Sequence, residues 1–364
     1  MKSILLLIHT ADDGGLGKAA LESLTAAQQM AEGMGGLELK AGLVGGAIQP
    51  AAELLAGAGV KTILGVESDA CAVSRYSTDA RAFSEIVKAA GADVVVAAGT
   101  SRMARCMPGV AQRAQGAIDT HISGIEPSPD GLKARRWYYR QRMEAILTRA
   151  QAPWFLLLSP GAFVPYSGTS TAQAEVQRLE LAETGSRTSV IGVEEAATGA
   201  QTIKPEAEVL LVAGAGWSKK QADGQAHLDQ AETLILGFLD KAKASLGSTK
   251  SLVDQSGEGH AVLSFMSHMN QVGQTGSSPR HAKGLATCCH GEEPHVVGWR
   301  FINQRRAINL DPSCGWAQGK ADVLYVADAF AVMRRVNELL YVAFGRVGRL
   351  DTEATAASTS GPGE

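Results

Sequence analysis

Two polar segments near the C-terminus contain the residue types from which a nucleotide-binding crevice is built. The first, Gln271–Gly276, combines side-chain amides and a hydroxyl with glycines, which let a loop bring its backbone N–H groups close to a ligand. The second, Ala307–Pro312, ends an apolar run with Asn309 and Asp311. Polar residues that follow a strand form the rim of a crevice at the carboxyl edge of a parallel sheet. The two segments together therefore predict a nucleotide site.

A third segment, Cys288–His295, places two thiols and two imidazoles close together in the chain. These side chains could bind a metal. However, adjacent cysteines on a strand point to opposite faces, and the spacing matches no common zinc pattern. A metal site is therefore the less favoured interpretation, and no metal ligands are predicted.

The first two segments, in this order, resemble the C-terminal part of the electron transfer flavoprotein alpha subunit. The match runs through Val272–Gly276 and Ile308–Pro312, and Val326–Phe330 is similar to the family's Val-Ala-Asp-Leu-Phe. Ser159–Phe163 resembles the family's Arg-Pro-Gly-Ala-Phe turn. The resemblance extends over roughly residues 2 to 340 and is that of a divergent bacterial-type member.

The resemblance implies FAD as the cofactor and assigns roles to the first segment. Thr275 would lie near the flavin ring, where a hydrogen-bond donor tunes the one-electron-reduced state. Gln274 would position the ring or the ribityl chain, with Val272 and Gly273 beside it. Without the resemblance, the same residues would be interpreted as an ordinary loop with satisfied polar side chains.

The cysteine- and histidine-containing segment also acquires a role through the resemblance. Gly291 and His295 fall on a glycine and a histidine of the family. The family histidine lies beside the pyrimidine edge of the flavin, where a positive charge or proton donor raises the one-electron potential. His290 stands at a serine position and could still donate a hydrogen bond.

The remaining matched residues would contact the nucleotide half of FAD. The resemblance implicates Asn309 in holding the adenosine half, and Asp311 forms the rim before Pro312 ends the strand. Asp328 is predicted as a helix N-cap, an adenine contact, or both. The alternative for Asn309 and Asp311 is a polar strand end with no ligand.

Two arginines that contact FAD in the family have no counterpart here. One would stand at Gly216 or Trp217, in the turn Gly214–Trp217, and the other in the segment Ser256–Gly259. The turn alone has only part of a dinucleotide fingerprint and could be a plain β-to-α turn. Nearby cations that could substitute for the arginines are Lys219, Lys220, Arg280 and Lys283.

The resemblance implies a redox electron carrier without substrate turnover of its own. Its partners would be a beta subunit that carries AMP, a flavin dehydrogenase as electron donor, and a membrane quinone reductase as acceptor. The missing arginines leave a second hypothesis open. The chain could be a non-redox nucleotide-binding or scaffolding subunit of a dehydrogenase complex that has lost FAD.

Composition limits the class of protein independently of these motifs. The 364 residues suffice for two domains, and a net charge of −3 with interspersed signs argues against nucleic-acid binding. Five cysteines without a CxxC pair argue against a disulfide framework and for a reducing compartment. The apolar run Ile4–Ile8 is too short for a signal-peptide core, and no apolar window is long enough to cross a bilayer. The protein is expected to be cytoplasmic and not membrane-embedded.

The elements that must position the motifs follow from apolar periodicity. The pattern predicts α/β architecture: two three-layer α/β/α domains with mostly parallel sheets, the second a Rossmann-like FAD-binding domain. We expect an N-terminal domain at 1–187 that docks the beta subunit, a linker at 188–204, the FAD domain at 205–345, and a disordered tail at 346–364.

Individual elements are predicted from the same pattern. In the first domain, strands are expected at Ile4–His9, Leu39–Val44, Thr62–Val66, Asp93–Ala98, Ile118–Ile125, Lys133–Tyr139 and Trp154–Leu158, with helices at Lys18–Ala31, Ala51–Ala58, Ala80–Ala90 and Met103–Gln115. In the second, strands are expected at Val209–Ala213, Ser251–Val253, Gly284–Thr287, Ala307–Asn309 and Val323–Val326, with helices at Gln225–Leu246 and Ala329–Phe344.

Overall fold

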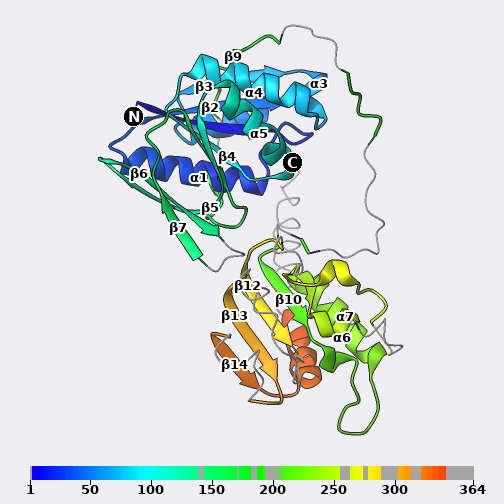
Figure 1. Cartoon of the computed structure of the whole chain (residues 1–364). Coiled ribbons are helices and arrows are strands. Elements are labelled where there is room, and N and C mark those ends of the chain that lie inside the picture. Colours follow the sequence, from blue (N-terminus) through cyan, green and yellow to red (C-terminus); the bar gives the residue numbers. More distant parts are fainter. Residues whose placement is uncertain are drawn as a thin grey trace, which may run out of the picture. The chain divides into compact units, whose positions relative to one another are not determined.

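A computed structural model divides the chain into two compact units, Met1–Glu195 and Ala196–Glu364 (Figure 1). Each unit has its own sheet, and each is described by itself. The structure describes residues 2–138, 143–169, 172–181, 187–192, 203–204, 207–254, 263–273, 278–287, 302–312 and 321–341.

The N-terminal unit is built on a nine-stranded sheet in the order β7-β6-β5-β8-β4-β1-β2-β3-β9. The strands from β5 to β9 in this order are parallel, whereas β6 and β7 continue the sheet as antiparallel strands. The strands are β1 (Ser3–His9), β2 (Glu38–Gly45), β3 (Thr62–Glu67), β4 (Val94–Ala98), β5 (Ala117–Ser128), β6 (Gly131–Tyr138), β7 (Met143–Leu147), β8 (Trp154–Leu158) and β9 (Gln177–Arg178).

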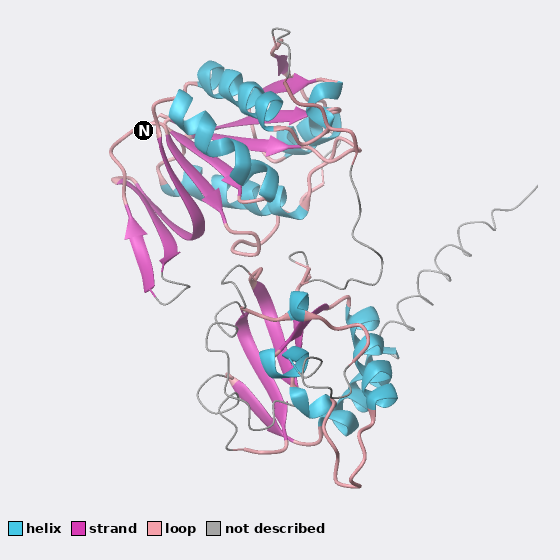
Figure 2. Ribbon diagram, turned by 45° about the vertical axis from the view of Figure 1, so that its right-hand side comes forward, coloured by secondary structure: helices cyan, strands magenta, loops and turns pink. Residues whose placement is uncertain are grey.

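Helices cover both faces of this sheet, as Figure 2 shows. They are α1 (Lys18–Gly33), α2 (Gln49–Gly57), α3 (Asp69–Ala72), α4 (Tyr76–Ala90) and α5 (Ser101–Arg113). On one face, α1 and α2 pack through Leu24, Met30 and Leu55. On the other, α4 and α5 pack through Phe83 and Val110. The unit therefore has the expected three layers, because a parallel sheet must bury both of its faces.

The apolar N-terminal run forms β1, an interior strand of this sheet. Ile4, Leu6 and Ile8 join the cluster under α1, whereas Leu5 and Leu7 join the cluster under α4. A strand that alternates between two buried faces must be apolar throughout, which is why its sequence shows no polar alternation. The prediction of a buried first strand is confirmed.

The C-terminal unit has a five-stranded parallel sheet in the order β11-β10-β12-β13-β14. Its strands are β10 (Val209–Ala213), β11 (Ser245–Ser248), β12 (His281–Thr287), β13 (Ile302–Asn309) and β14 (Val323–Val326). Helical segments are η1 (Ala215–Trp217), α6 (Leu228–Ala242), α7 (Lys250–Asp254), η3 (His268–Asn270) and a helix over residues 329–341. The described helices gather on one face through a shared cluster that includes Ile235, Leu252 and Met333 (Figure 2).

One predicted element of this unit is too long, and another is wrong. The helix expected over Gln225–Leu246 ends at Ala242, because Lys243 adopts a left-handed φ of 49°, and Leu246 lies in β11. The strand expected over Ser251–Val253 is part of helix α7. The Thr249 hydroxyl accepts a hydrogen bond from the Leu252 N–H at 3.3 Å, which satisfies one end of that helix.

The chain enters the C-terminal unit along the amino edge of its sheet. The Lys204 N–H donates to Ser245 Oγ at 2.7 Å, and His281 Nε2 donates to the Lys204 carbonyl oxygen at 2.9 Å. Ser245 begins β11 and His281 begins β12, so Lys204 is held at the start of two strands. Ile203 packs beside them in the smaller core cluster.

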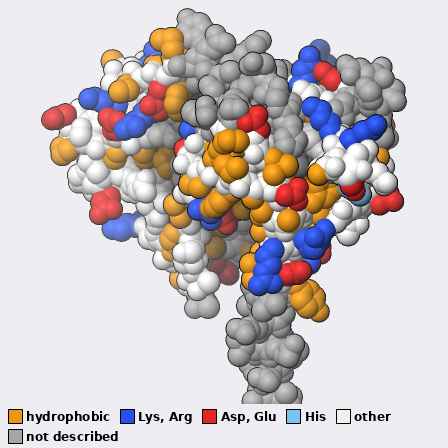
Figure 3. All heavy atoms as spheres, turned by 90° about the horizontal axis from the view of Figure 1, so that it is seen from below, with side chains coloured by type: hydrophobic (Ala, Val, Ile, Leu, Met, Phe, Trp, Pro, Cys, Tyr) orange, Lys and Arg blue, Asp and Glu red, His pale blue; other side chains and the backbone are white. Residues whose placement is uncertain are grey.

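Several predictions fall wholly or partly outside the described residues: most of the linker, the end of the last helix beyond residue 341, and the tail at 346–364. Within the described part, no helix is both long and apolar enough to cross a membrane. Acidic and basic side chains are interspersed on the surface seen in Figure 3.

Candidate functional site

The strand order of the C-terminal sheet brings the predicted site segments to one edge. All five strands are parallel, so their carboxyl ends lie along the same edge. From β10 the chain first moves to β11 on one side, and then crosses to β12 on the other. Open α/β sheets bind ligands in a crevice outside such a switch point, which here falls between the carboxyl ends of β10 and β12. We therefore take this edge as the candidate site.

The turn that follows β10 lies at this switch point. Gly214 donates its N–H to the Thr287 carbonyl oxygen at 2.8 Å, and Trp217 Nε1 donates to Thr287 Oγ1 at 2.9 Å. The Trp217 ring also lies against Phe330, with ring centroids 4.5 Å apart. Trp217 and Thr287 are both fully buried. The turn is thus joined to the end of β12 by one backbone hydrogen bond and one side-chain hydrogen bond.

Val272 and Gly273 lie beside the end of β11. The Val272 N–H donates to the Ser248 carbonyl oxygen at 3.1 Å. Gly247 allows the close approach, because a Cβ there would lie 2.5 Å from Val272 Cγ2. Gly273 has a φ of 81°, a conformation that favours glycine, and its N–H donates to Ser278 Oγ at 2.7 Å. The predicted neighbours Gln274 and Thr275 lie outside the described residues.

Asn309 ends β13 with its side chain buried. Its Nδ2 donates to the Asp311 carbonyl oxygen at 2.8 Å, whereas Oδ1 has no hydrogen-bond partner among the described residues. Ser248 Oγ, at the end of β11, is also buried without a partner in that part of the chain. Buried polar atoms are rarely left unsatisfied in native proteins. These two oxygens are therefore the places at this edge where a ligand could add a hydrogen bond.

Asp311 and Asp328 lie at the carboxyl ends of β13 and β14. Asp311 is exposed. The Asp328 carboxylate accepts a hydrogen bond from the Ala331 N–H at 2.7 Å, which makes it the N-cap of the last helix. The capping prediction is confirmed, and the contact with adenine remains a prediction.

The other predicted flavin residues, His290, Gly291 and His295, lie outside the described residues, as does the Ser256–Gly259 segment. Thr287, the last described residue before His290, ends β12. Among the described residues, no group of three or more histidine, cysteine or acidic side chains could bind a metal.

The four basic side chains that could substitute for the missing arginines lie at two different edges of the C-terminal sheet. Arg280 and Lys283 belong to the start of β12 at the amino edge, where Lys283 forms an ion pair with Glu208. They are too far along the strand to serve the carboxyl edge. Lys219 and Lys220, in contrast, follow the turn after β10 and are exposed at the carboxyl edge.

Sequence reasoning missed Lys250, which lies two residues after β11 and is exposed at the same carboxyl edge, where it forms an ion pair with Asp254 at 3.5 Å. It also missed Ser248, because the sequence was interpreted as a helix that ends at Leu246 and a strand that begins at Ser251, which left Ser248 outside any strand. The capping hydroxyl of Thr249 was the signal that marked a strand end and a helix start at this point.

The corresponding edge of the N-terminal unit is closed by its own hydrogen bonds. At the end of β1, Thr10 Oγ1 donates to the Ala47 carbonyl oxygen at 2.7 Å. At the end of β4, Gly99 N–H donates to the Leu158 carbonyl oxygen at 2.7 Å. The Ser159–Phe163 turn is also tied down, since Gly161 N–H donates to Glu22 Oε2 at 2.7 Å.

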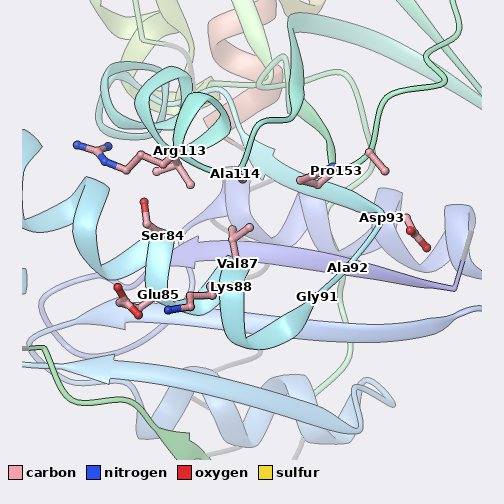
Figure 4. Close-up of a pocket in the computed structure, with 12 residues that line it drawn as sticks. Ser84, Glu85, Val87, Lys88, Gly91, Ala92, Asp93, Arg113, Ala114 and Pro153 are labelled. Carbon is pink, nitrogen blue, oxygen red and sulfur yellow. The ribbon is translucent and has the colours of Figure 1, made fainter.

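A pocket of about 620 Å³ lies between α4 and α5 of the N-terminal unit (Figure 4). Its lining includes Lys88, Asp93, Arg113 and Pro153. Asp93 and Pro153 directly precede β4 and β8, so the pocket lies at the amino edge of the sheet. Ligands of open parallel sheets bind at the opposite edge, and no predicted site residue lines this pocket.

Comparison with known proteins adds independent evidence. A family model described as the electron transfer flavoprotein domain matches residues 4–184. The electron transfer flavoprotein subunit alpha of Clostridium acetobutylicum is 24% identical over 337 residues, which cover 90% of this chain and 92% of the relative. The subunit of the same name from Thermoanaerobacterium thermosaccharolyticum is 23% identical over 327 residues, covering 88% and 92%. Both alignments are longer than the N-terminal unit and so include residues of the C-terminal unit.

Proposed function

The chain belongs to the electron transfer flavoprotein family, and from that premise we propose that it is the alpha subunit of an electron carrier that holds FAD at the carboxyl edge of its C-terminal sheet. Bound FAD would supply the electron-accepting and electron-donating chemistry. The chain itself would bind and orient the cofactor and would turn over no substrate.

The two buried oxygens without partners are the observation that carries the proposal. Asn309 Oδ1 and Ser248 Oγ flank the crevice at the ends of β13 and β11. A buried acceptor without a partner costs about 1–3 kcal/mol, so a ligand that donates hydrogen bonds there would recover that energy. Ribityl hydroxyls and the adenine amino group are donors of this kind. The residues present therefore fit a dinucleotide.

The pyrophosphate of FAD needs positive charge from this chain. In many dinucleotide folds a helix N-terminus directly after the first strand supplies it. Here residues 218–227 separate η1 from α6, so that helix start does not follow the turn. We propose that Lys219, Lys220 and Lys250, at the carboxyl ends of β10 and β11, replace the absent arginines.

The predicted site residues keep their proposed roles toward FAD. Val272 and Gly273 would line the crevice with Gln274 and Thr275. His290, Gly291 and His295 would approach the flavin from the end of β12, and Asn309, Asp311 and Asp328 would hold the nucleotide half. The domain containing these residues would extend over 205–345, after a linker at 188–204.

The N-terminal domain, 1–187, would dock a beta subunit that carries AMP. The hydrogen bonds at its carboxyl edge support a structural role, because no buried side-chain nitrogen or oxygen at the ends of β1 and β4 lacks a partner among the described residues. Electrons would come from a flavin dehydrogenase and pass to a membrane quinone reductase. We propose a cytoplasmic location for the complex.

The first test is the absorption spectrum of the protein coexpressed with its beta partner, with identification of the nucleotide released on denaturation. Flavin bands with stoichiometric FAD are expected. A colourless, folded heterodimer that takes up no added FAD would refute the proposal. The missing arginine at the Gly216 turn would then favour a scaffolding subunit.

The second test compares the two edges of the same sheet. A triple variant, Lys219→Ala, Lys220→Ala and Lys250→Ala, is expected to weaken FAD binding at least about tenfold, the lower end of a charge-assisted hydrogen bond. The control, Arg280→Ala with Lys283→Ala, removes cations from the amino edge and should leave the dissociation constant unchanged. If the triple variant and the control weakened FAD binding equally, the positive charge would act at long range and not at the proposed site.

A further inference from the structure

The pocket of the N-terminal unit lies between the C-terminal halves of α4 and α5 (Figure 4). At their N-terminal halves, the two helices are joined by the buried ion pair between Asp79 and Arg102. Among the described ion pairs, none joins them at the pocket. The pocket volume of about 620 Å³ is in the range of small-molecule sites.

Four polar side chains gather at one end of this pocket in Figure 4: Ser84, Glu85, Lys88 and Arg113. Lys88 and Arg113 are basic and Glu85 is acidic, and all three are exposed. No ion pair of the described chain includes Glu85 or Lys88. The Ser84 hydroxyl donates to the Ala80 carbonyl oxygen at 2.6 Å, so its oxygen remains as an acceptor. This end of the pocket therefore offers both signs of charge to a ligand.

The Arg113 guanidinium is held in place by its own helix and by the start of α4. Its Nη1 donates to the Gly109 carbonyl oxygen at 3.1 Å, and its central carbon lies 6.0 Å from the centre of the Tyr76 ring. The remaining N–H groups are available to a ligand. A planar guanidinium binds a carboxylate with two parallel hydrogen bonds. Arg113, with Lys88 nearby, is therefore suited to a carboxylate.

The same end of the pocket also attracts a positive group. α4 ends at Ala90 and α5 ends at Arg113, so the C-terminal ends of both helices border the pocket. Helix C-termini carry partial negative charge, to which Glu85 adds a full charge and Ser84 an acceptor. These groups oppose an isolated anion. They would instead stabilise an ammonium group that stands beside the carboxylate.

Apolar surface separates these polar side chains from Asp93 at the other end of the pocket. Val87 and Pro153 lie between the two ends in Figure 4, and Ala114 also lines the pocket. The Asp93 carboxylate already accepts a hydrogen bond from the Lys2 N–H. The middle of the pocket therefore favours an apolar group, because burial of apolar surface is favourable and a polar group there would lose its hydrogen bonds to water.

We propose that this pocket binds an apolar α-amino acid in its zwitterionic form. Arg113 and Lys88 hold the carboxylate, Glu85 and Ser84 Oγ hold the ammonium group, and the side chain lies on the apolar middle of the pocket. The bound amino acid joins α4 to α5 at their C-terminal halves. The site is independent of the proposed flavin function, since no proposed cofactor residue lines it.

The first experiment is isothermal titration calorimetry with L-phenylalanine as the probe. It uses the full-length protein in the form in which it purifies, with any partner subunit that it retains. A dissociation constant of about 1 mM or below is expected. Phenylpropanoate lacks the ammonium group and phenethylamine lacks the carboxylate, so each should bind about tenfold more weakly or worse, the lower end of a charge-assisted hydrogen bond. Glycine lacks the apolar group and should show no binding at about 10 mM.

The second experiment repeats the titrations with variants of the pocket. Glu85→Gln should weaken L-phenylalanine binding about tenfold but strengthen phenylpropanoate binding, because it removes both an attraction to the ammonium group and a repulsion of the carboxylate. Arg113→Gln and Lys88→Gln should weaken the binding of both probes. Glu32→Gln and Lys61→Gln are the controls, because they remove exposed charges of the same unit that do not line the pocket, and they should leave both dissociation constants unchanged.

All five substituted side chains are exposed, so unfolding midpoints without ligand should match the wild type. Absence of L-phenylalanine binding to the wild type at about 10 mM would overturn the proposal. Tighter binding of phenylpropanoate than of L-phenylalanine would also overturn it, because the pocket would then be an anion site. Pocket variants that bind the probes like the controls would place the ligand elsewhere and overturn it as well. A protein without flavin gives the same titrations, so failure of the proposed function is detected separately.

Discussion

Ser245 and Ser248 are the first and last residues of β11, and their hydroxyl groups differ in hydrogen bonding. The Ser245 hydroxyl accepts a hydrogen bond from Lys204 N–H, whereas the Ser248 hydroxyl has no partner within the described chain. Both side chains are fully buried. At the residue scale, this contrast separates a hydroxyl needed by the fold from one available to a ligand.

Ser248→Ala is expected to leave the apoprotein unchanged or slightly more stable, because it removes an unsatisfied buried group. The same change should weaken FAD binding by about 1 kcal/mol, one net hydrogen bond. Ser245→Ala should do the reverse and lower the free energy of unfolding by about 1–3 kcal/mol, since it leaves the Lys204 N–H unpaired. Urea unfolding of the apoprotein and FAD titration measure the two effects. A loss of apoprotein stability in Ser248→Ala would contradict the prediction.

Arg102 and Asp79 form a buried ion pair in the N-terminal unit. Arg102 Nε and Nη2 donate to the two carboxylate oxygens at 2.9 and 2.6 Å, and Nη2 also donates to the Cys71 carbonyl oxygen. Asp79→Asn should lower the free energy of unfolding by about 3–5 kcal/mol, because it leaves a buried charge uncompensated. The exposed pair Lys243–Asp240 is the control. Asp240→Asn should change stability by less than about 1 kcal/mol in the same urea titration.

At the element scale, strands with long apolar runs and uninterrupted helical periods were predictable from the sequence. The bounds of β8, β10 and β14 match the prediction, and those of β1 to β4 differ by one residue at one end or at both. The predicted bounds are wrong where the backbone conformation of a single residue interrupts the apolar periodicity. Lys243 ends α6 in a left-handed conformation that the sequence signals only when glycine or asparagine occupies it.

The short antiparallel strand β7 was missed for a different reason. Met143 and Ile146 are exposed, so its apolar residues do not mark a buried face. In the candidate site, the residues of motifs at strand ends could be predicted, because parallel strands share one carboxyl edge. Ser248 and Lys250 could not be predicted as site residues, because the sequence did not reveal β11. The hydrogen bond between Trp217 and Thr287 could not be predicted either, because it joins residues 70 positions apart.

Lys243 offers a prediction at this scale. Lys243→Gly should raise the free energy of unfolding by up to about 1 kcal/mol, because glycine adopts a positive φ without steric cost and the lost ion pair with Asp240 is exposed. Gln230→Gly, inside α6, is the control and should lower it by about 1 kcal/mol. Thermal or urea unfolding distinguishes the two. Destabilisation by both glycines would mean that the end of α6 is not set by the conformation of Lys243.

At the scale of the whole molecule, the pH dependence of stability should contain two opposite contributions from the N-terminal unit. Burial raises the pKa of Glu22, although the Gly161 N–H and Lys18 oppose the shift. Hydrogen bonding from Arg149 lowers the pKa of Asp119 against the effect of burial, with Trp154 adding a further bond. The folded state therefore favours a protonated Glu22 and an ionised Asp119.

The signs follow from these shifts. The contribution of Glu22 is present below its unfolded pKa and is lost as pH rises through its folded pKa. That of Asp119 is present above its unfolded pKa and is lost as pH falls through its folded pKa. Relative to wild type, Glu22→Gln should be more stable at neutral pH, Asp119→Asn should be less stable, and both differences should shrink toward acid. Urea unfolding from about pH 2 to 8 checks this, because the contribution of Asp119 is lost only below the ordinary Asp pKa of about 4. Differences in stability from wild type that stay constant over this range would contradict it.

Lys204 is attached at the start of β11 and β12. A rotation of the C-terminal sheet about this attachment would therefore displace the opposite edge of the sheet most. A five-residue strand such as β10 spans about 17 Å from the edge where the connection arrives to the edge proposed for FAD. A rotation of about 10° around that attachment would move the far edge by about 3 Å. A ligand at that far edge, such as the proposed FAD, would thus be displaced by a small rotation about Lys204, while its contacts within the C-terminal unit stayed intact.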